Sequence, residues 1–116
     1  MSGVRLVVNL HSKPGHAADY IAACQARGEE VRREPGCLQY ELCHSSVHPD
    51  NVVLLEWWDS RANFDDHWEL ERSRTPVGIE FLGKWNDREI GEDGLEIYWE
   101  QTAYRFDTAT ETWTPR

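Results

Sequence analysis

Aliphatic and polar positions recur along the chain in two rhythms, one typical of strands and one of helices. Residues 4–10 are rich in β-branched and aliphatic residues with no breaker, which predicts a strand covered on both faces. Residues 16–33 instead repeat apolar positions at spacings of four and three, which predicts a helix. Its stripe consists of Ala17, Ile21, Cys24, Gly28 and Val31. Pro35 restricts the residue before it and predicts the end of this helix.

The next segments predict a hairpin followed by a capped helix. Strands are expected over residues 37–44 and 52–58, joined by a loop with the turn sequence Pro49-Asp50-Asn51. The second strand carries apolar residues on both of its faces. Ser60 is the expected N-cap of a helix that places Phe64, His67 and Trp68 on one side.

The last third of the chain predicts a second short helix and a final strand. Thr75 is the expected cap of that helix and Pro76 its first residue. The side chains it is expected to bury are Val77, Phe81, Leu82 and Trp85. Residues 87–94 read as a polar loop and residues 95–106 as the last strand. Residues 107–116 are expected to form a short terminal hairpin or to lie over a neighbouring molecule.

This order of elements is β-α-β-β-α-β with one additional helix, which predicts a ferredoxin-like α+β domain with a split βαβ arrangement. At 116 residues the chain is expected to be a single domain, with residues 106–116 as a C-terminal extension. The helices cover one face of the four-stranded antiparallel sheet. Because the strands are apolar on both sides, the other face is expected to pack on a partner.

The net negative charge of the chain disfavours some classes of binding partner. It carries 12 basic and 21 acidic residues, a formal net charge of -9, which repels phosphate backbones and anionic lipid. No apolar run reaches membrane length, and the start of the chain lacks the features of a signal peptide. We therefore expect a cytoplasmic protein that binds neither nucleic acid nor membranes.

The three cysteines are expected to be reduced thiols. Cys37 and Cys43 would lie on one strand about 20 Å apart, far beyond disulfide reach. Cys43, His44 and His48 do not form a convincing metal site, because adjacent strand residues face opposite sides and no second Cys/His pair stands at ligand spacing. No metal site is therefore expected.

Three short motifs follow one another in the middle of the chain. They are Glu34-Pro-Gly-Cys37 before one strand, Glu56-x-Trp58-x-Ser60 at the end of the next, and His67 on the helix after it. In this layout, over roughly residues 4–70, the chain resembles the antibiotic biosynthesis monooxygenase family. The resemblance implies a homodimer whose two sheets form a dimeric α/β barrel. It also implies a pocket for flat aromatic substrates, with Trp58 as one wall.

Three residues are predicted to carry chemistry. His67 is a candidate base because the unperturbed pKa of an imidazole, near 6.5, suits proton abstraction from a phenol, although a histidine on an apolar helix face often only packs. Asn9 places an amide among Val and Leu, so it either bonds to backbone or orients a ligand oxygen. Trp58 is expected to stack on substrate. Further substrate contacts are predicted for His11, Tyr40, Trp57, Phe64 and Trp68.

The function that this resemblance implies is a monooxygenase that needs no cofactor. Such an enzyme oxidises a planar phenolic, polyketide or quinol-type aromatic substrate with molecular oxygen, because the substrate carbanion itself supplies the electrons. The alternatives are an isomerase or decarboxylase on the same scaffold and a non-catalytic dimeric accessory protein. Haem degradation is disfavoured: Asn9 and Trp58 approximate the pattern of the haem-degrading relatives, but the segment after Trp68 lacks their histidine.

Overall fold

A computed structural model describes residues 2–83 and 95–116 of the chain. It contains a four-stranded sheet, three helices, one 3-10 turn and a separate two-stranded hairpin. The elements are β1 (Ser2–His11), α1 (Ala17–Ala23), α2 (Gln25–Arg32), β2 (Cys37–His44), β3 (Asn51–Trp58), α3 (Arg61–Ser73), η1 (Ile79–Phe81), β4 (Leu95–Thr102), β5 (Tyr104–Asp107) and β6 (Thr112–Pro115).

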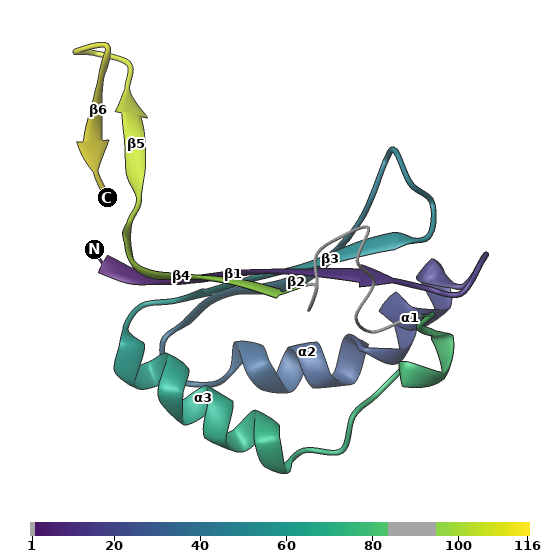
Figure 1. Ribbon diagram of the computed structural model, residues 1–116. Coiled ribbons are helices and arrows are strands. Elements are labelled where there is room, and N and C mark those ends of the chain that lie inside the picture. The colour runs from purple at the N-terminus through teal and green to yellow at the C-terminus, as the bar shows by residue number, and fades with distance from the viewer. Residues whose placement is uncertain (1, 84–94) are drawn as a thin grey trace.

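The main sheet has the strand order β2-β3-β1-β4, and all of its neighbouring strands are antiparallel. The three helices lie together on one face of this sheet (Figure 1). This arrangement confirms the expected α+β class and its split βαβ topology. No helix within the described residues is long and apolar enough to span a membrane.

Alternation along the strands places the core between the sheet and the helices. Every second side chain of β1 from Val4 onward is buried beneath the helices, as are Val52 and Trp58 of β3. Val31 of α2 and Phe64 of α3 close the core from the helix side. The β1 side chains concerned are Val4, Leu6, Val8 and Leu10.

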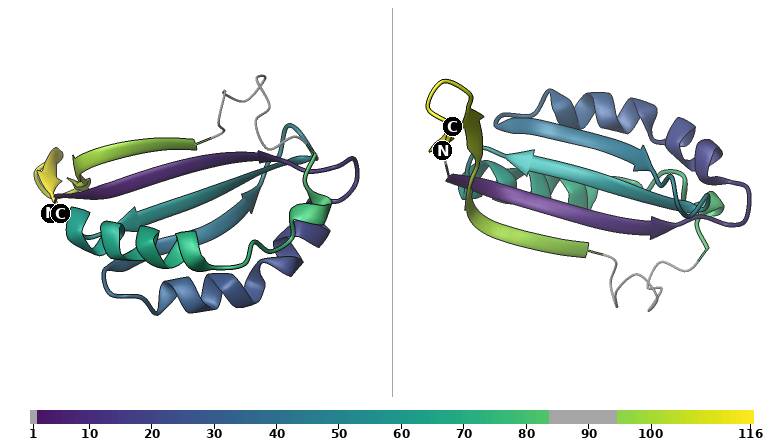
Figure 2. Two further views of the ribbon diagram at one scale, coloured as in Figure 1. Left: turned by 60° about the horizontal axis from the view of Figure 1, so that its bottom comes forward. Right: turned by 90° about the horizontal axis from the view of Figure 1, so that it is seen from above.

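The opposite face of the sheet is open. Val7 of β1 and Val53, Leu55 and Trp57 of β3 point to this side and are only partly buried. Apart from the hairpin of β5 and β6 at one end, no described helix or strand lies over it when the molecule is viewed from above (Figure 2, right). The barrel of two subunits that would cover this face stays a prediction.

The predicted helix over residues 16–33 is divided into α1 and α2, which meet at Cys24. The backbone N–H of Cys24 is shared between the carbonyl oxygens of Tyr20 and Ile21, both at 3.2 Å. One turn is therefore tightened, so the helical hydrogen-bond ladder is interrupted there. The buried positions still follow the predicted stripe at Ala17, Gly28 and Val31.

The predicted helix beginning at Thr75 is wrong. After α3 the chain runs extended and forms only the 3-10 turn Ile79–Phe81. Gly78 adopts a left-handed conformation with φ of 72°, and a Cβ there would lie 3.0 Å from the Tyr20 ring. Close approach to α1 therefore overrides the local helical signals. Leu82 is buried as expected, whereas Trp85 and the predicted loop at residues 87–94 fall outside the described residues.

The predicted last strand is also shorter than expected. β4 ends at Thr102, and the chain then turns away from the sheet into the hairpin of β5 and β6. The terminal hairpin is present, but it begins at Tyr104 rather than near residue 107.

The Glu34-Pro-Gly-Cys37 turn connects the helices to the sheet. Gly36 has a φ of 79°, in the left-handed region that favours glycine. Its carbonyl accepts the N–H of Asp59 at 2.9 Å, next to Ser60, whose side chain caps α3 through Asn63 N–H at 3.1 Å. The turn before β2 is thereby fixed against the start of α3.

Gly36→Ala is expected to destabilise the fold much more than Gly15→Ala. Both glycines have a φ of 79°, so both substitutions incur a left-handed backbone strain of about 1 kcal/mol. A Cβ at Gly15 meets nothing within 4 Å, but one at Gly36 would lie 2.3 Å from Asp59 Oδ1 and 2.8 Å from Asn63 Cβ. This overlap should add about 1 to 3 kcal/mol. Urea unfolding measures both changes, and equal losses of stability would contradict the packing described for this turn.

Candidate active site

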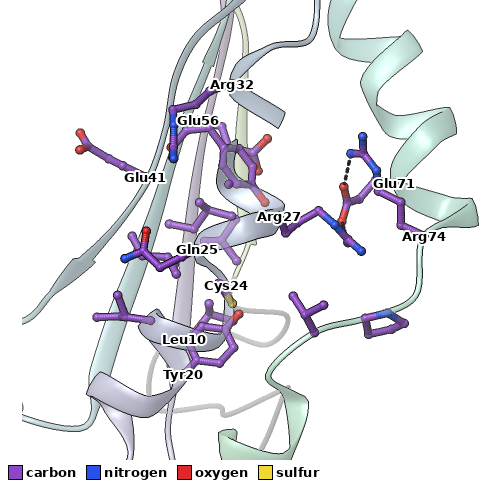
Figure 3. Close-up of a pocket in the computed structure, with 18 of the residues that line it drawn as sticks. Leu10, Tyr20, Cys24, Gln25, Arg27, Arg32, Glu41, Glu56, Glu71 and Arg74 are labelled. Carbon is purple, nitrogen blue, oxygen red and sulfur yellow. Dashed lines mark hydrogen bonds and ion pairs between the residues drawn. The ribbon is translucent and has the colours of Figure 1, made fainter. Parts of the chain in front are cut away.

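A cavity of about 480 Å³ lies between the sheet and the helix layer (Figure 3). Its walls are mainly aliphatic and aromatic side chains from β1, β2, β3 and α1. They include Val8, Leu10, Tyr20, Ile21, Tyr40, Leu42 and Leu54. The volume falls in the range of sites that bind drug-sized ligands, roughly 300 to 1,000 Å³.

Polar side chains gather at the side of the cavity next to α3. His67, Glu71 and Arg74 reach it from α3 and the residue that follows, and Glu56 reaches it from β3. Figure 3 shows Glu56, Arg27 and the paired Glu71 and Arg74 around this region. An apolar cavity with a few convergent polar groups is the usual form of a binding or catalytic site.

The imidazole of His67 is buried and held by a carboxylate. Its Nδ1 lies 2.9 Å from Oε1 of Glu34, while Oε2 of Glu34 accepts a hydrogen bond from Arg74 at 2.9 Å. A carboxylate that pairs with a guanidinium only accepts hydrogen bonds, so Nδ1 of His67 is the donor in this contact. The neutral ring then has its lone pair on Nε2, which lies 3.6 Å from Oε1 of Glu56 and 4.0 Å from Oε2 of Glu71.

The indole ring of Trp58 packs against the imidazole ring of His67. The two rings stack with their centroids 4.3 Å apart and an interplanar angle of 26°. Trp58 has no exposed surface and is not among the residues that line the cavity. Its indole N–H donates to Oε1 of Glu56 at 3.1 Å. The indole expected to form a substrate wall thus contacts the candidate base and an adjacent carboxyl group instead.

Glu56 is a buried carboxyl group at the edge of the cavity. Burial raises its pKa to about 7, and the nearby Glu71 and Glu34 carboxylates add to this, while the hydrogen bond from Trp58 opposes it. A group of this kind exchanges a proton near neutral pH. Glu56 is therefore a second candidate acid or base beside His67.

The two tyrosines of the cavity remain neutral hydroxyl groups. Burial raises the pKa of Tyr20 and Tyr40 far above the ordinary value, and the Glu56 carboxyl group raises that of Tyr40 further. The Tyr40 ring meets His67 edge-on at 6.2 Å. Both side chains can offer a ring face and a hydroxyl group to a bound ligand.

The structure brings together only some of the residues predicted from sequence. Tyr40, His67 and Trp68 line the cavity. Phe64 is buried beside it in the core, in ring contact with both His67 and Trp68. The roles assigned to these residues stay predictions, but their common location supports them.

Asn9, His11 and Trp57 lie on the opposite face of the sheet. They alternate along β1 and β3 with the buried residues that face the helices, and Asn9 pairs with Val53 of the open face. The expected convergence of Asn9 with His67 is therefore not found within one chain. Successive side chains of a strand point to opposite sides of the sheet, so Asn9 points away from the face that carries the helices and His67.

The charged residues of the site that were not predicted as functional include Glu34, Glu56, Glu71 and Arg74. For Glu56 a signal exists, because it is a carboxyl group between Leu54 and Trp58 on a strand face that is otherwise apolar. Glu71 and Arg74 give no comparable signal, since charged residues near the end of a helix are usually solvated.

Glu56→Gln is expected to remove a pH dependence of stability. The pKa of Glu56 is about 7 in the folded chain and has its ordinary value of 4.5 in the unfolded chain, so the folded chain binds this proton more tightly. The stabilisation from this proton is fully present below pH 4.5 and is lost as the pH rises through about 7. Between pH 5 and 8 the free energy of unfolding of wild type should therefore fall by roughly 2 to 3 kcal/mol more than that of Glu56→Gln. Urea unfolding at fixed protein concentration measures this, with Glu29→Gln on the exposed side of α2 as the charge-matched control. Parallel pH profiles for wild type and Glu56→Gln would refute the raised pKa.

The sequence matches the profile of a known protein family. The profile of the family described as "Antibiotic biosynthesis monooxygenase" matches residues 3–75. The protein sll1783 of Synechocystis is 30% identical over 90 residues, a match that covers 78% of this chain and 58% of that protein. Protein SchA of Streptomyces halstedii is 28% identical over 81 residues, covering 65% of this chain and 21% of SchA. The chain thus spans less than two thirds of the length of either relative.

Solved structures share the fold. A conserved protein from Methanosarcina mazei superimposes with a TM-score of 0.65 at 22% identity, covering 87% of this chain and 95% of the other. Protein SO0527 from Shewanella oneidensis gives a TM-score of 0.61 at 25% identity, covering 84% and 87%. The profile match spans both the turn that carries Glu34 and the helix that carries His67, and it covers more than half of the chain. The chain therefore belongs to the antibiotic biosynthesis monooxygenase family.

Proposed function

We propose that this protein is a monooxygenase that oxidises a planar phenolic or anthrone-type aromatic substrate with molecular oxygen and without a cofactor. The observation that carries the proposal is a buried histidine, oriented by a carboxylate, at the edge of a largely apolar cavity of about 480 Å³. Family membership supports the reaction class, and the site geometry supports the residues.

His67 is the proposed general base. Glu34 fixes the ring orientation and holds the proton on Nδ1, so that Nε2 is left as the basic nitrogen. When Nε2 accepts a proton, the resulting imidazolium lies among the carboxyl groups of Glu34, Glu56 and Glu71. The imidazolium would thus form beside carboxyl groups with which it can pair.

The reaction balances without an external reductant. His67 takes a proton from the methylene carbon of an anthrone or from its phenol tautomer, leaving a delocalised carbanion. One electron passes from this anion to molecular oxygen, and the two radicals combine to form a C–O bond. The resulting peroxide anion takes the proton back from His67, which gives a hydroperoxide and restores the neutral base. The hydroperoxide then loses water as the remaining C–H bond and the O–O bond break, so the methylene group and molecular oxygen become a ketone carbonyl and water. A dry pocket assists because it keeps bulk water from protonating the anion.

The walls of the cavity suit a flat ligand. One side is the sheet, represented by Leu42 and Leu54, and the other is α1, represented by Ile21. A site bounded by two layers of secondary structure is narrow in one direction, which favours planar ring systems. The hydroxyl groups of Tyr20 and Tyr40, kept protonated by burial, are proposed to donate hydrogen bonds to substrate oxygens.

Haem is a poorer ligand for this site. Nδ1 of His67 is engaged by Glu34, and the segment after Trp68, where the haem-degrading relatives carry their histidine, has none. An isomerase or decarboxylase could use the same base and cavity without oxygen. A non-catalytic accessory protein would need neither.

His67→Gln is expected to lower turnover of an anthrone by roughly a hundredfold or more, because general-base catalysis contributes about 10² to 10⁴. The measurement is oxygen uptake alongside quinone absorbance, corrected for autoxidation without protein. His48→Gln is the matched control, since His48 is exposed and is not among the residues that line the cavity. It should retain full activity.

The same assay separates the alternatives. One molecule of oxygen should be consumed for each quinone formed, and no product should appear without oxygen. Product formation under nitrogen would favour the isomerase or decarboxylase. Equal turnover rates for wild type and His67→Gln, at the same melting temperature, would show that His67 is not the general base.

A further inference from the structure

The glutamates around the imidazole of His67 differ in their partners. Glu34 and Glu71 both accept hydrogen bonds from Arg74, at 2.9 and 3.1 Å. In the part of the chain that the structure describes, no arginine or lysine lies within ion-pair distance of Glu56. A buried carboxyl group without a cationic partner is more stable when it carries a proton. Glu56 is therefore the member of this cluster best suited to hold a proton and to release it.

The hydrogen bond that Glu56 accepts indicates which of its oxygens carries this proton. Oε1 accepts the indole N–H of Trp58 at 3.1 Å, and the same oxygen lies 3.6 Å from Nε2 of His67. In a neutral carboxyl group the carbonyl oxygen is the better acceptor, so the acidic hydrogen is expected on Oε2. Glu56 is itself part of the cavity wall (Figure 3), where this hydrogen can meet a bound ligand.

A hydroperoxide needs an acid as well as a base in order to lose water. Removal of its remaining C–H proton drives electrons into the O–O bond, and the departing oxygen leaves as hydroxide unless a proton reaches it. Hydroxide is a poor leaving group, and a positioned acid speeds such a step by roughly 10²- to 10⁴-fold. Because His67 acts as the base at this point, the proton must come from another group.

Glu56 is close enough to His67 to act on the same hydroperoxide. The carbon that loses its proton and the oxygen that departs are separated by a single oxygen atom, so base and acid must lie side by side. Nε2 of His67 and Oε1 of Glu56 meet this requirement at 3.6 Å, and both residues line the cavity. Tyr20 and Tyr40 also line it, but burial raises the pKa of both hydroxyl groups far above the ordinary value, which makes them weaker acids.

We propose that Glu56 is a catalytic residue that donates a proton to the departing oxygen of the hydroperoxide while His67 removes the proton from carbon, a role that presupposes the proposed oxygenation of an anthrone. The C–H and O–O bonds break and the carbonyl bond forms. The departing hydroxide takes the proton of Glu56 and leaves as water. The step ends with an imidazolium at His67 and a carboxylate at Glu56.

The two side chains then restore each other without a further proton donor. The imidazolium carries its new proton on Nε2, which lies 3.6 Å from Oε1 of Glu56. This separation is longer than a hydrogen bond, so the proton returns after a small movement of the glutamate side chain or through one bridging water. With a pKa of about 7, Glu56 holds its proton in about half of the molecules at pH 7, so the acid is present when the hydroperoxide forms.

Glu56→Gln separates the two halves of the reaction, because an amide has the shape of a protonated carboxyl group but cannot transfer a proton. Full-length protein in excess over an anthrone is mixed rapidly with oxygenated buffer at pH 7. Oxygen uptake, quinone absorbance and hydroperoxide in acid-quenched samples are followed, the last by its oxidation of ferrous iron. In Glu56→Gln oxygen uptake should stay within about threefold of wild type, quinone formation should slow by about tenfold or more, and hydroperoxide should accumulate.

Glu69→Gln is the matched control. Glu69 lies on α3 with His67, but its side chain is 73% exposed and it is not among the residues that line the cavity. This variant loses the same carboxyl group and should form quinone at the wild-type rate without detectable hydroperoxide. Melting temperatures measured beside the kinetics show that each variant is folded at the assay temperature.

The possible failures are distinguishable. Quinone formation at the wild-type rate in Glu56→Gln, without hydroperoxide, would show that another group donates the proton. Loss of oxygen uptake in folded Glu56→Gln would place Glu56 before the oxygen step and would also overturn the assigned role. Wild type that consumes no oxygen would instead refute the proposed oxygenation, and the role of Glu56 would fall with it.

Discussion

The contact between Glu34 and His67 joins the two halves of the helix layer and defines the polar side of the cavity. Glu34 comes from the turn that follows α2, and His67 comes from the middle of α3, 33 residues later. Burial of an imidazole or of a carboxylate without a partner costs free energy. The two groups therefore stabilise each other in their buried positions. Arg74 completes the arrangement by bridging Glu34 and Glu71. The same interaction that fixes α3 on α2 therefore also fixes the protonated nitrogen of the histidine.

Around this contact, the parts of the site serve both packing and chemistry. Trp58 is fully buried core, yet its ring stacks on His67 and its N–H donates to Glu56. Glu56 retains a raised pKa because the strand that carries it is covered by the helix layer. Substitution of any of these residues is therefore expected to affect folding and function together, which is why each proposed variant is compared with a matched control.

Sequence patterns predicted most of the fold and part of the site. Strong periodicity located β1, β2, β3 and α3, and the Ser60 cap was predicted correctly because capping is a local property. The helix expected after Thr75 failed because Gly78 packs against Tyr20, a tertiary contact that local signals do not contain. His67 and Tyr40 were placed at the cavity by motif and pattern. Asn9 was misjudged because its face of the sheet depends on which side the helices cover, and Glu34 was missed because its partner lies far along the sequence.

The most direct test of this account is the protonation state of the His67 ring. Long-range ¹H–¹⁵N correlation NMR distinguishes the two nitrogen atoms, and the signals of His67 among the five histidines are assigned by their absence in His67→Gln. In the neutral ring we expect a proton on Nδ1 and a bare Nε2, and we expect Glu34→Ala to abolish this preference. A ring that carries its proton on Nε2, or that keeps the same tautomer without Glu34, would contradict the assignment of His67 as a base oriented by Glu34.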